Sequence, residues 1–103
     1  MGKKKKTSFQ KIINSNQPVL VDFTATWCGP CKAMAPVLKE VSAEVGDIAR
    51  IIKIDVDKNS AMAQKLGIRG VPTFILYKQG KVLWRESGMQ SKQQLVNLIE
   101  KHA

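Results

Sequence analysis

The only two cysteines of this chain, Cys28 and Cys31, lie three positions apart in the segment TWCGPCK. Such a pair could supply half of a metal site, close a structural disulfide or act as two reactive thiols. A structural zinc site needs about four cysteine or histidine ligands, and the chain adds only His102, for which we expect no special role. A disulfide across so short a loop removes little entropy from the unfolded chain. Reactive thiols are the interpretation that suits the spacing best.

The neighbouring residues favour thiol chemistry. We expect Cys28 at the N-terminal edge of a helix, where free N–H groups and the helix dipole favour the thiolate that attacks disulfides. Cys31, one turn on, could then resolve a mixed disulfide at high effective concentration. Gly29 would permit a tight approach to the helix. Pro30 would occupy an early helical position, where a backbone N–H would be unpaired in any case. Lys32 adds a nearby positive charge, although an exposed lysine contributes little.

Hydrophobic periodicity and chain breakers predict the elements that must position these thiols. We expect helices over residues 7–14, 32–45 and 61–66, with a kink at Pro36 and a last helix capped by Ser91. Strands are expected over residues 19–23, 51–56, 73–77 and 82–86, and Gln79-Gly80 forms a hairpin turn between the last two. The first strand is a nearly continuous apolar run, which is typical of a central strand covered on both faces.

This order predicts an α/β fold with a central mixed sheet of four to five strands, flanked by helices on both faces. Strands that alternate with helices imply right-handed crossovers and parallel pairs, and the hairpin adds one antiparallel edge pair. The cysteines follow the carboxyl end of the first strand, where sites form in open sheets of this kind. We expect one domain over residues 7–103, after a basic tail over residues 1–6.

The composition is that of a globular domain, with 44% hydrophobic residues and a formal net charge of +9. Five of the 17 basic residues lie in the first eleven positions, so much of the excess charge is a solvated tail that could attract polyanions weakly. No nucleic-acid-binding motif accompanies the tail. No apolar run reaches the ~18 residues of a membrane span, and no apolar segment of a signal peptide follows the basic start. We therefore expect a cytoplasmic protein that binds neither membranes nor a specific nucleic acid.

TWCGPCK resembles the active-site motif of the thioredoxins, and the resemblance extends from about Ser8 to His102. It includes VDF before the motif, Pro36 after it, GIRGVPTF around Pro72, and SGMQSK before the last helix. The resemblance implies a thioredoxin fold and a monomeric thiol–disulfide oxidoreductase that reduces protein disulfides. It implies no bound cofactor, because electrons would come from NADPH through a flavin-containing thioredoxin reductase. Acceptors would be disulfides of ribonucleotide reductase, peroxiredoxins and methionine sulfoxide reductases.

Two charged residues in the predicted strands need a reason. A carboxylate in a buried strand is costly unless it is paired or protonated, so Asp22 lies either at a wet strand end or in the interior. The resemblance implies a buried acid behind Cys31 that accepts its proton. Lys53 matches the family lysine that approaches this acid, although it could also simply extend to water.

The resemblance further implies a substrate-binding rim. Pro72 would have a cis peptide bond and face the cysteines, leaving the Val71 backbone free to pair with an extended substrate segment. Gly70, Gly88 and Met89 match other loops that surround the family's active site. On their own, the two glycines are ordinary turn residues.

Trp27 is expected to be partly exposed because it precedes the nucleophile in a loop. With Val71 and Met89 it would form an apolar patch for substrates, and Asp57 could accept its indole N–H. The chain departs from the family at Thr24, where many thioredoxins have tryptophan. It also departs before the first helix, where the lysine run replaces an edge strand, so we expect four clear strands and a fifth that is short or absent.

Two other functions fit the same fold. The chain could be a disulfide oxidase or isomerase, although Gly-Pro between the cysteines favours a reductant by resemblance. It could also be a non-catalytic module that binds partners through the same surface.

Overall fold

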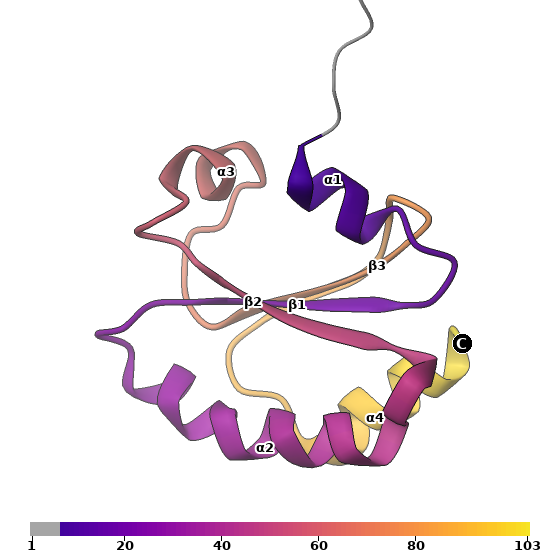
Figure 1. Cartoon of the computed structure of the whole chain (residues 1–103). Coiled ribbons are helices and arrows are strands. Elements are labelled where there is room, and N and C mark those ends of the chain that lie inside the picture. The colour runs from indigo at the N-terminus through magenta and orange to yellow at the C-terminus, as the bar shows by residue number, and fades with distance from the viewer. Residues whose placement is uncertain (1–6) are drawn as a thin grey trace, which may run out of the picture.

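The computed structural model describes residues 7–103. The helices and strands of this part of the chain follow one another in the predicted order (Figure 1), and their bounds are α1 Ser8–Ile13, β1 Val19–Thr24, α2 Gly29–Val45, β2 Arg50–Asp55, α3 Ser60–Lys65, β3 Thr73–Lys78, β4 Lys81–Ser87 and α4 Lys92–Lys101. A short 3-10 helix, η1 Gly46–Ile48, is the one element in this part of the chain that the sequence did not predict. The prediction of one domain over residues 7–103 stays a prediction.

The four strands in the described residues form one mixed sheet in the order β2-β1-β3-β4. β1 pairs in parallel with β2, whereas β3 is antiparallel to both β1 and β4. The prediction that only the hairpin pair would be antiparallel was therefore wrong. Because β1 and β2 are parallel and β3 is antiparallel to β1, β3 starts near the end of the sheet where β2 finishes and runs back.

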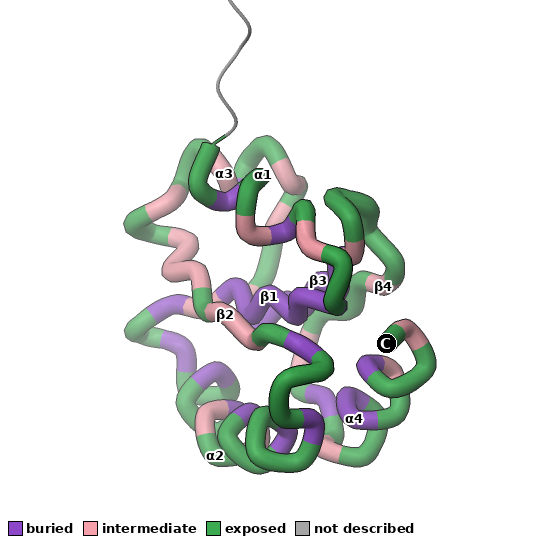
Figure 2. The backbone as a smooth tube through the Cα atoms, turned by 45° about the vertical axis from the view of Figure 1, so that its right-hand side comes forward, coloured by how far each residue is buried: buried purple, intermediate pink, exposed green. Residues whose placement is uncertain are grey.

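Helices cover both faces of the sheet, with α1 and α3 on one face and α2 and α4 on the other (Figure 1). Because side chains alternate along β1, Leu20 packs with the α2 and α4 residues while Val21 and Phe23 pack with Phe9 of α1. β1 and β3 are buried almost throughout, as the tube in Figure 2 shows, whereas β2 and β4 form the sheet edges. The prediction of a central first strand is confirmed.

The ends of the elements use the residues that the sequence indicated. Thr7 caps α1, and Ser91 caps α4 by accepting the backbone N–H of Gln94. The hairpin turn has positive φ angles at Gln79 (54°) and Gly80 (78°), which suits the twist of the flanking strands. The predicted basic tail, and the place of a fifth edge strand before α1, lie at residues outside the described part of the chain.

Candidate active site

Cys28 and Cys31 form a disulfide at the start of α2, with their Cα atoms 5.3 Å apart. Cys28 is the N-cap of the helix, and the Cys31 backbone N–H points at the Cys28 Sγ with an N–S distance of 3.1 Å. On reduction, this N–H and the positive end of a 17-residue helix would stabilise a thiolate on Cys28. The geometry suits Cys28 as the attacking sulfur.

The helix start explains the two residues between the cysteines. Gly29 is the first residue of α2 and Pro30 the second, where the missing proline N–H leaves no helical bond unmade. The interpretation that Gly29 allows a tight approach to the helix was wrong, because an added Cβ would meet nothing within 4 Å. Gly29 leaves open space beside Cys28. Further along, α2 continues through Pro36 to Val45, and the predicted kink stays a prediction.

A loop from the far side of the sheet faces the disulfide. The Val71–Pro72 peptide bond is cis, as the resemblance implied, and the Val71 carbonyl oxygen lies 3.7 Å from the Cys28 Sγ. The Gly88 N–H donates to the Pro72 carbonyl at 2.8 Å, which links this loop to the end of β4. The Thr73 hydroxyl donates to the Gly70 carbonyl at 2.6 Å. These bonds hold the loop containing Gly70, Val71 and Pro72 in place beside Cys28.

Exposed apolar side chains surround a disulfide that is itself nearly inaccessible. Cys28 is only 3% exposed, whereas Trp27 is 69% and Met89 55% exposed. The Trp27 indole N–H donates to Asp57 Oδ2 at 2.9 Å, so the predicted bond is confirmed and orients the ring. Trp27, Val71 and Met89 come from three separate loops, and Trp27 and Met89 offer apolar surface to a partner.

Asp22 lies in the interior rather than at a solvent-exposed end of the strand, with 1% of its surface exposed. Its Oδ1 has no hydrogen-bond partner among residues 7–103. Burial raises the pKa of Asp22 from 3.8 to about 6, and the positive charge of Lys53 partly offsets the shift. Near neutral pH this carboxyl can therefore both accept and release a proton.

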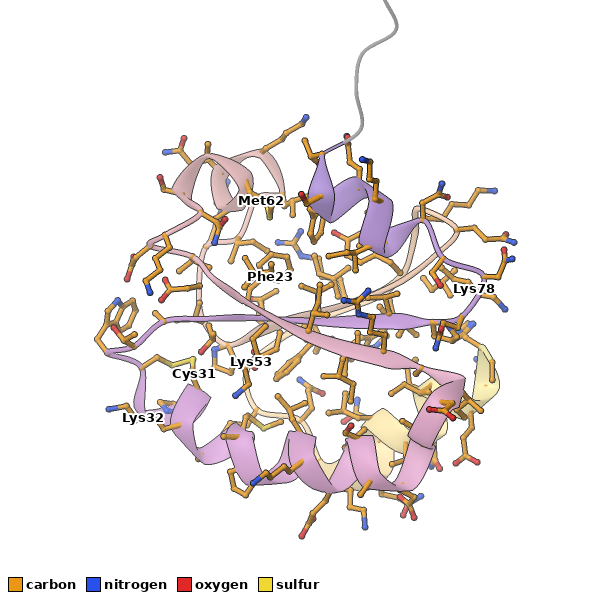
Figure 3. The ribbon with its side chains drawn as sticks, viewed as in Figure 1. Phe23, Cys31, Lys32, Lys53, Met62 and Lys78 are labelled. Carbon is orange, nitrogen blue, oxygen red and sulfur yellow. A yellow bond between two sulfur atoms is a disulfide. The ribbon has the colours of Figure 1, made fainter. Side chains whose placement is uncertain are left out.

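Lys53 lies opposite Asp22 in the β1–β2 register. Its side chain is exposed, and no ion pair within 4.0 Å joins it to Asp22 in the described part of the chain. Figure 3 shows Lys53 on the same side of the sheet as Cys31 and α2. Lys53 thus both reaches water and acts on the acid through its charge.

A hollow of about 340 Å³ lies beside the disulfide, and sequence reasoning did not find it. Its lining residues are Thr24, Ala25, Thr26, Cys31, Lys32, Ala35, Lys53 and Asp55. The available signal was the short side chain of Thr24, which leaves room where a larger residue would fill the space. Within residues 7–103 no group of three or more histidine, cysteine, aspartate or glutamate side chains could hold a metal ion.

A cysteine pair at a helix start, a cis-proline loop facing it and a buried acid on a mixed sheet together define a thiol–disulfide exchange site on a thioredoxin-like fold. The thioredoxin family model matches residues 1–101. The chain belongs to the thioredoxin family.

Individual relatives agree with this assignment. The chain is 50% identical over 94 residues to thioredoxin Y2, chloroplastic, of Arabidopsis thaliana, covering 90% of this chain but only 56% of that protein. It therefore spans little more than half the length of this plant relative. It is 44% identical over 91 residues to the thioredoxin of Haemophilus influenzae, covering 88% of this chain and 85% of that one. Among solved structures, thioredoxin NaTrxh of Nicotiana alata matches with a TM-score of 0.81 and 45% identity, over 91% of this chain and 80% of that chain.

Proposed function

We propose that this chain reduces protein disulfides by dithiol–disulfide exchange through Cys28 and Cys31. The observation that carries the proposal is the 3.1 Å contact between the Cys31 N–H and the Cys28 Sγ at the N-terminus of α2. A hydrogen bond and a helix terminus both favour the charged form of this sulfur. Although Cys28 itself is only 3% exposed, the open space at Gly29 and the exposed Trp27 and Met89 would give a substrate segment room to bind beside it.

The reaction has two steps. The Cys28 thiolate attacks one sulfur of the substrate disulfide, forms a mixed disulfide and releases the other substrate sulfur as a thiolate that takes a proton. The Cys31 thiol then loses its proton and attacks Cys28 Sγ, which closes the Cys28–Cys31 disulfide and releases the second substrate thiolate. The substrate gains two electrons and two protons, and the cysteine pair loses them.

We propose that Asp22 accepts the proton that Cys31 loses, either directly or through a water molecule. The carboxyl lies on the α2 face of β1, and its pKa of about 6 suits a general base near neutral pH. Lys53, opposite it in the sheet, would tune this pKa rather than react itself. The Val71 backbone would hold an extended substrate segment, with Gly70, Gly88 and Met89 at the rim.

The oxidised pair needs an external electron donor. We infer a flavin-containing thioredoxin reductase that uses NADPH, with no cofactor bound to this chain. The relatives' family membership supports such partners in general, as well as disulfide-containing protein substrates. No helix in residues 7–103 is long and apolar enough to cross a membrane. We propose that the chain is a monomer and that it works in a reducing compartment, the cytoplasm.

A single-turnover assay tests the proposal. Pre-reduced wild-type protein is mixed with insulin, and the free thiols of insulin are counted after acid quench. We expect stoichiometric reduction by the wild type and a stable mixed disulfide through Cys28 in the Cys31→Ser variant. A Cys28→Ser variant is the matched control and should trap nothing. Failure of the wild type to reduce insulin, or adducts that accumulate equally on both variants, would contradict the proposal.

A further inference from the structure

The hydroxyl groups of Thr73 and Ser87 form a chain of hydrogen bonds that ends at the loop facing Cys28. The Thr73 Oγ1 donates to the Gly70 carbonyl oxygen at 2.6 Å, and it lies 3.0 Å from the Ser87 Oγ. A carbonyl oxygen only accepts, so the first bond uses the one proton of the Thr73 hydroxyl. Ser87 must therefore donate in the second bond, and the chain runs from Ser87 through Thr73 to Gly70.

This hydroxyl chain lies on the face of the sheet away from α2. Thr73 is opposite Phe23 in the β1–β3 register and opposite Ser87 in the β3–β4 register, and side chains opposite one another share a face. Phe23 packs on the face covered by α1 and α3 (Figure 1). Thr73 is fully buried, whereas Ser87 is exposed. Because the cysteines lie at the start of α2, the two hydroxyls can act on the site only through the loop.

The bond from Thr73 fixes a peptide unit that side-chain packing does not hold. Gly70 has no side chain, and a Cβ added there would meet nothing within 4 Å. The Gly70–Val71 peptide is trans, so its carbonyl and its N–H point in opposite directions. The Thr73 hydroxyl draws the Gly70 carbonyl toward itself and therefore turns the Val71 N–H away.

The Val71 N–H is left for a partner outside this domain. Among residues 7–103 it has no hydrogen-bond acceptor, and the Val71 carbonyl oxygen lies 3.7 Å from the Cys28 Sγ. The Gly88 N–H holds the Pro72 carbonyl at 2.8 Å, so the peptide unit after Pro72 is fixed as well. An N–H held in this way could donate to the main chain of an extended substrate segment whose disulfide lies at Cys28.

We propose that Thr73, oriented by Ser87, is a positioning residue for protein substrates. This inference rests on the proposed thiol–disulfide exchange and adds a means by which the site favours disulfides that lie within a peptide chain. Thr73 sets the direction of the Val71 N–H, and that N–H binds the substrate main chain while Cys28 attacks the disulfide. A small disulfide without a peptide chain needs the thiolate alone. Loss of the hydroxyls should therefore affect the two kinds of substrate unequally.

Single-turnover reduction of two substrates tests the role of Thr73. Pre-reduced protein is mixed with insulin or with bis(hydroxyethyl) disulfide, which has no peptide chain, and substrate thiols are counted after acid quench. Thr73→Val keeps the shape of the side chain without its hydroxyl, and Thr73→Ser is the matched control that keeps the hydroxyl. We expect Thr73→Val to slow insulin reduction about tenfold, the scale of one lost hydrogen bond, and to change the small-disulfide rate less than about twofold. Thr73→Ser should stay within about twofold of the wild type for both substrates.

Ser87 gives a second test at an exposed position, where truncation should not disturb the fold. Ser87→Ala should slow insulin reduction about threefold, because the Thr73 hydroxyl loses the bond that orients it, and should leave the small-disulfide rate unchanged. Ser87→Thr keeps a hydroxyl and is expected to behave like the wild type. In the Thr73→Val background, Ser87→Ala should have no further effect, because the chain of hydrogen bonds is already broken.

The pattern of losses separates positioning from a purely structural role. Wild-type insulin rates in Thr73→Val and Ser87→Ala would overturn the inference, and so would equal losses with insulin and with the small disulfide. An effect of Ser87→Ala that is the same with and without the Thr73 hydroxyl would also contradict it. If urea unfolding shows that Thr73→Val folds poorly, the comparison of Ser87→Ala with Ser87→Thr decides. If the wild type reduces neither substrate, the proposed function itself fails.

Discussion

The two faces of the sheet each bury one ionisable side chain without a hydrogen-bond partner among the described residues. Asp22 lies on the face covered by α2 and α4, and Tyr77 on the face covered by α1 and α3. Tyr77 packs edge-on against Phe9, with ring centroids 5.6 Å apart. Burial raises the pKa of both groups, and a nearby cation, Lys53 or Arg85, offsets part of the shift in each case.

The same burial has opposite consequences on the two faces. A raised pKa moves Asp22 to about 6, so this group can change its charge near neutral pH. Tyr77 starts from 10.0 and its pKa moves higher, so the phenol stays neutral. The α2 and α4 face therefore buries a group that can titrate near neutral pH, whereas the group buried on the α1 and α3 face cannot.

Removal of the nucleophile should affect activity alone. Cys28→Ser is expected to lower insulin reduction by at least about a thousandfold, because a hydroxyl is a far weaker nucleophile than a thiolate and no disulfide can close. The matched change on the other face, Tyr77→Phe, should leave the rate within twofold. Single-turnover insulin reduction measures both. A large loss of rate in Tyr77→Phe would break the division between the faces.

Truncation of Phe9 should affect stability alone. Phe9 contacts Phe23 and Tyr77 and holds α1 on the sheet, so Phe9→Ala should lower the free energy of unfolding by about 3 kcal/mol. Lys11→Ala, an exposed change on the same helix, should cost less than about 0.5 kcal/mol. Urea unfolding gives both values. A Phe9→Ala variant that unfolds like the wild type would show that α1 is not part of the folded core.

Asp22→Asn should stabilise the protein in a pH-dependent way. The native pKa of about 6 lies above the unfolded value of 3.8, so the native state binds more protons and stability falls as pH rises between these values. The penalty is absent below pH 3.8 and complete above about pH 6. A shift of this size corresponds to roughly 3 kcal/mol.

Urea unfolding of wild type and Asp22→Asn at pH 4 and pH 8 measures this effect. The variant should gain up to roughly 3 kcal/mol at pH 8, less the cost of a buried amide, and close to nothing near pH 4. It should also resolve mixed disulfides more slowly at pH 7. An equal gain at both pH values would mean that the charge of Asp22 is not what destabilises the native state.

Tyr77→Phe should have the smallest effect. It removes a buried hydroxyl that has no partner, so the free energy of unfolding should change by less than about 1 kcal/mol and could rise. The change should be the same at pH 4 and pH 8, because the phenol does not titrate there. A loss of 2 kcal/mol or more would show that the hydroxyl has a bound partner, such as water.

Much of the site could be predicted from local sequence. The cysteine spacing, Pro30 and the helix periodicity placed Cys28 at a helix start, because these signals act over a few residues. The exposure of Trp27 and its bond to Asp57 were also anticipated. The direction of β3 was not predicted, because it depends on which end of the sheet the chain after β2 reaches, and no short-range pattern specifies that. The role given to Gly29 was wrong, because the space around a residue depends on the packing of the whole chain, and an added Cβ there would meet nothing within 4 Å.

Residue types and short-range spacing were enough to indicate the cysteine pair, the order of the elements and the family. The desolvation of Asp22 and the position of the Val71 carbonyl opposite Cys28 depend instead on the tertiary structure. The tertiary structure also decides that Cys31 lines a hollow together with two lysines. The physical reason is that burial, and with it the pKa and access of each group, is set by residues that are distant in the chain and meet only when the sheet and helices pack.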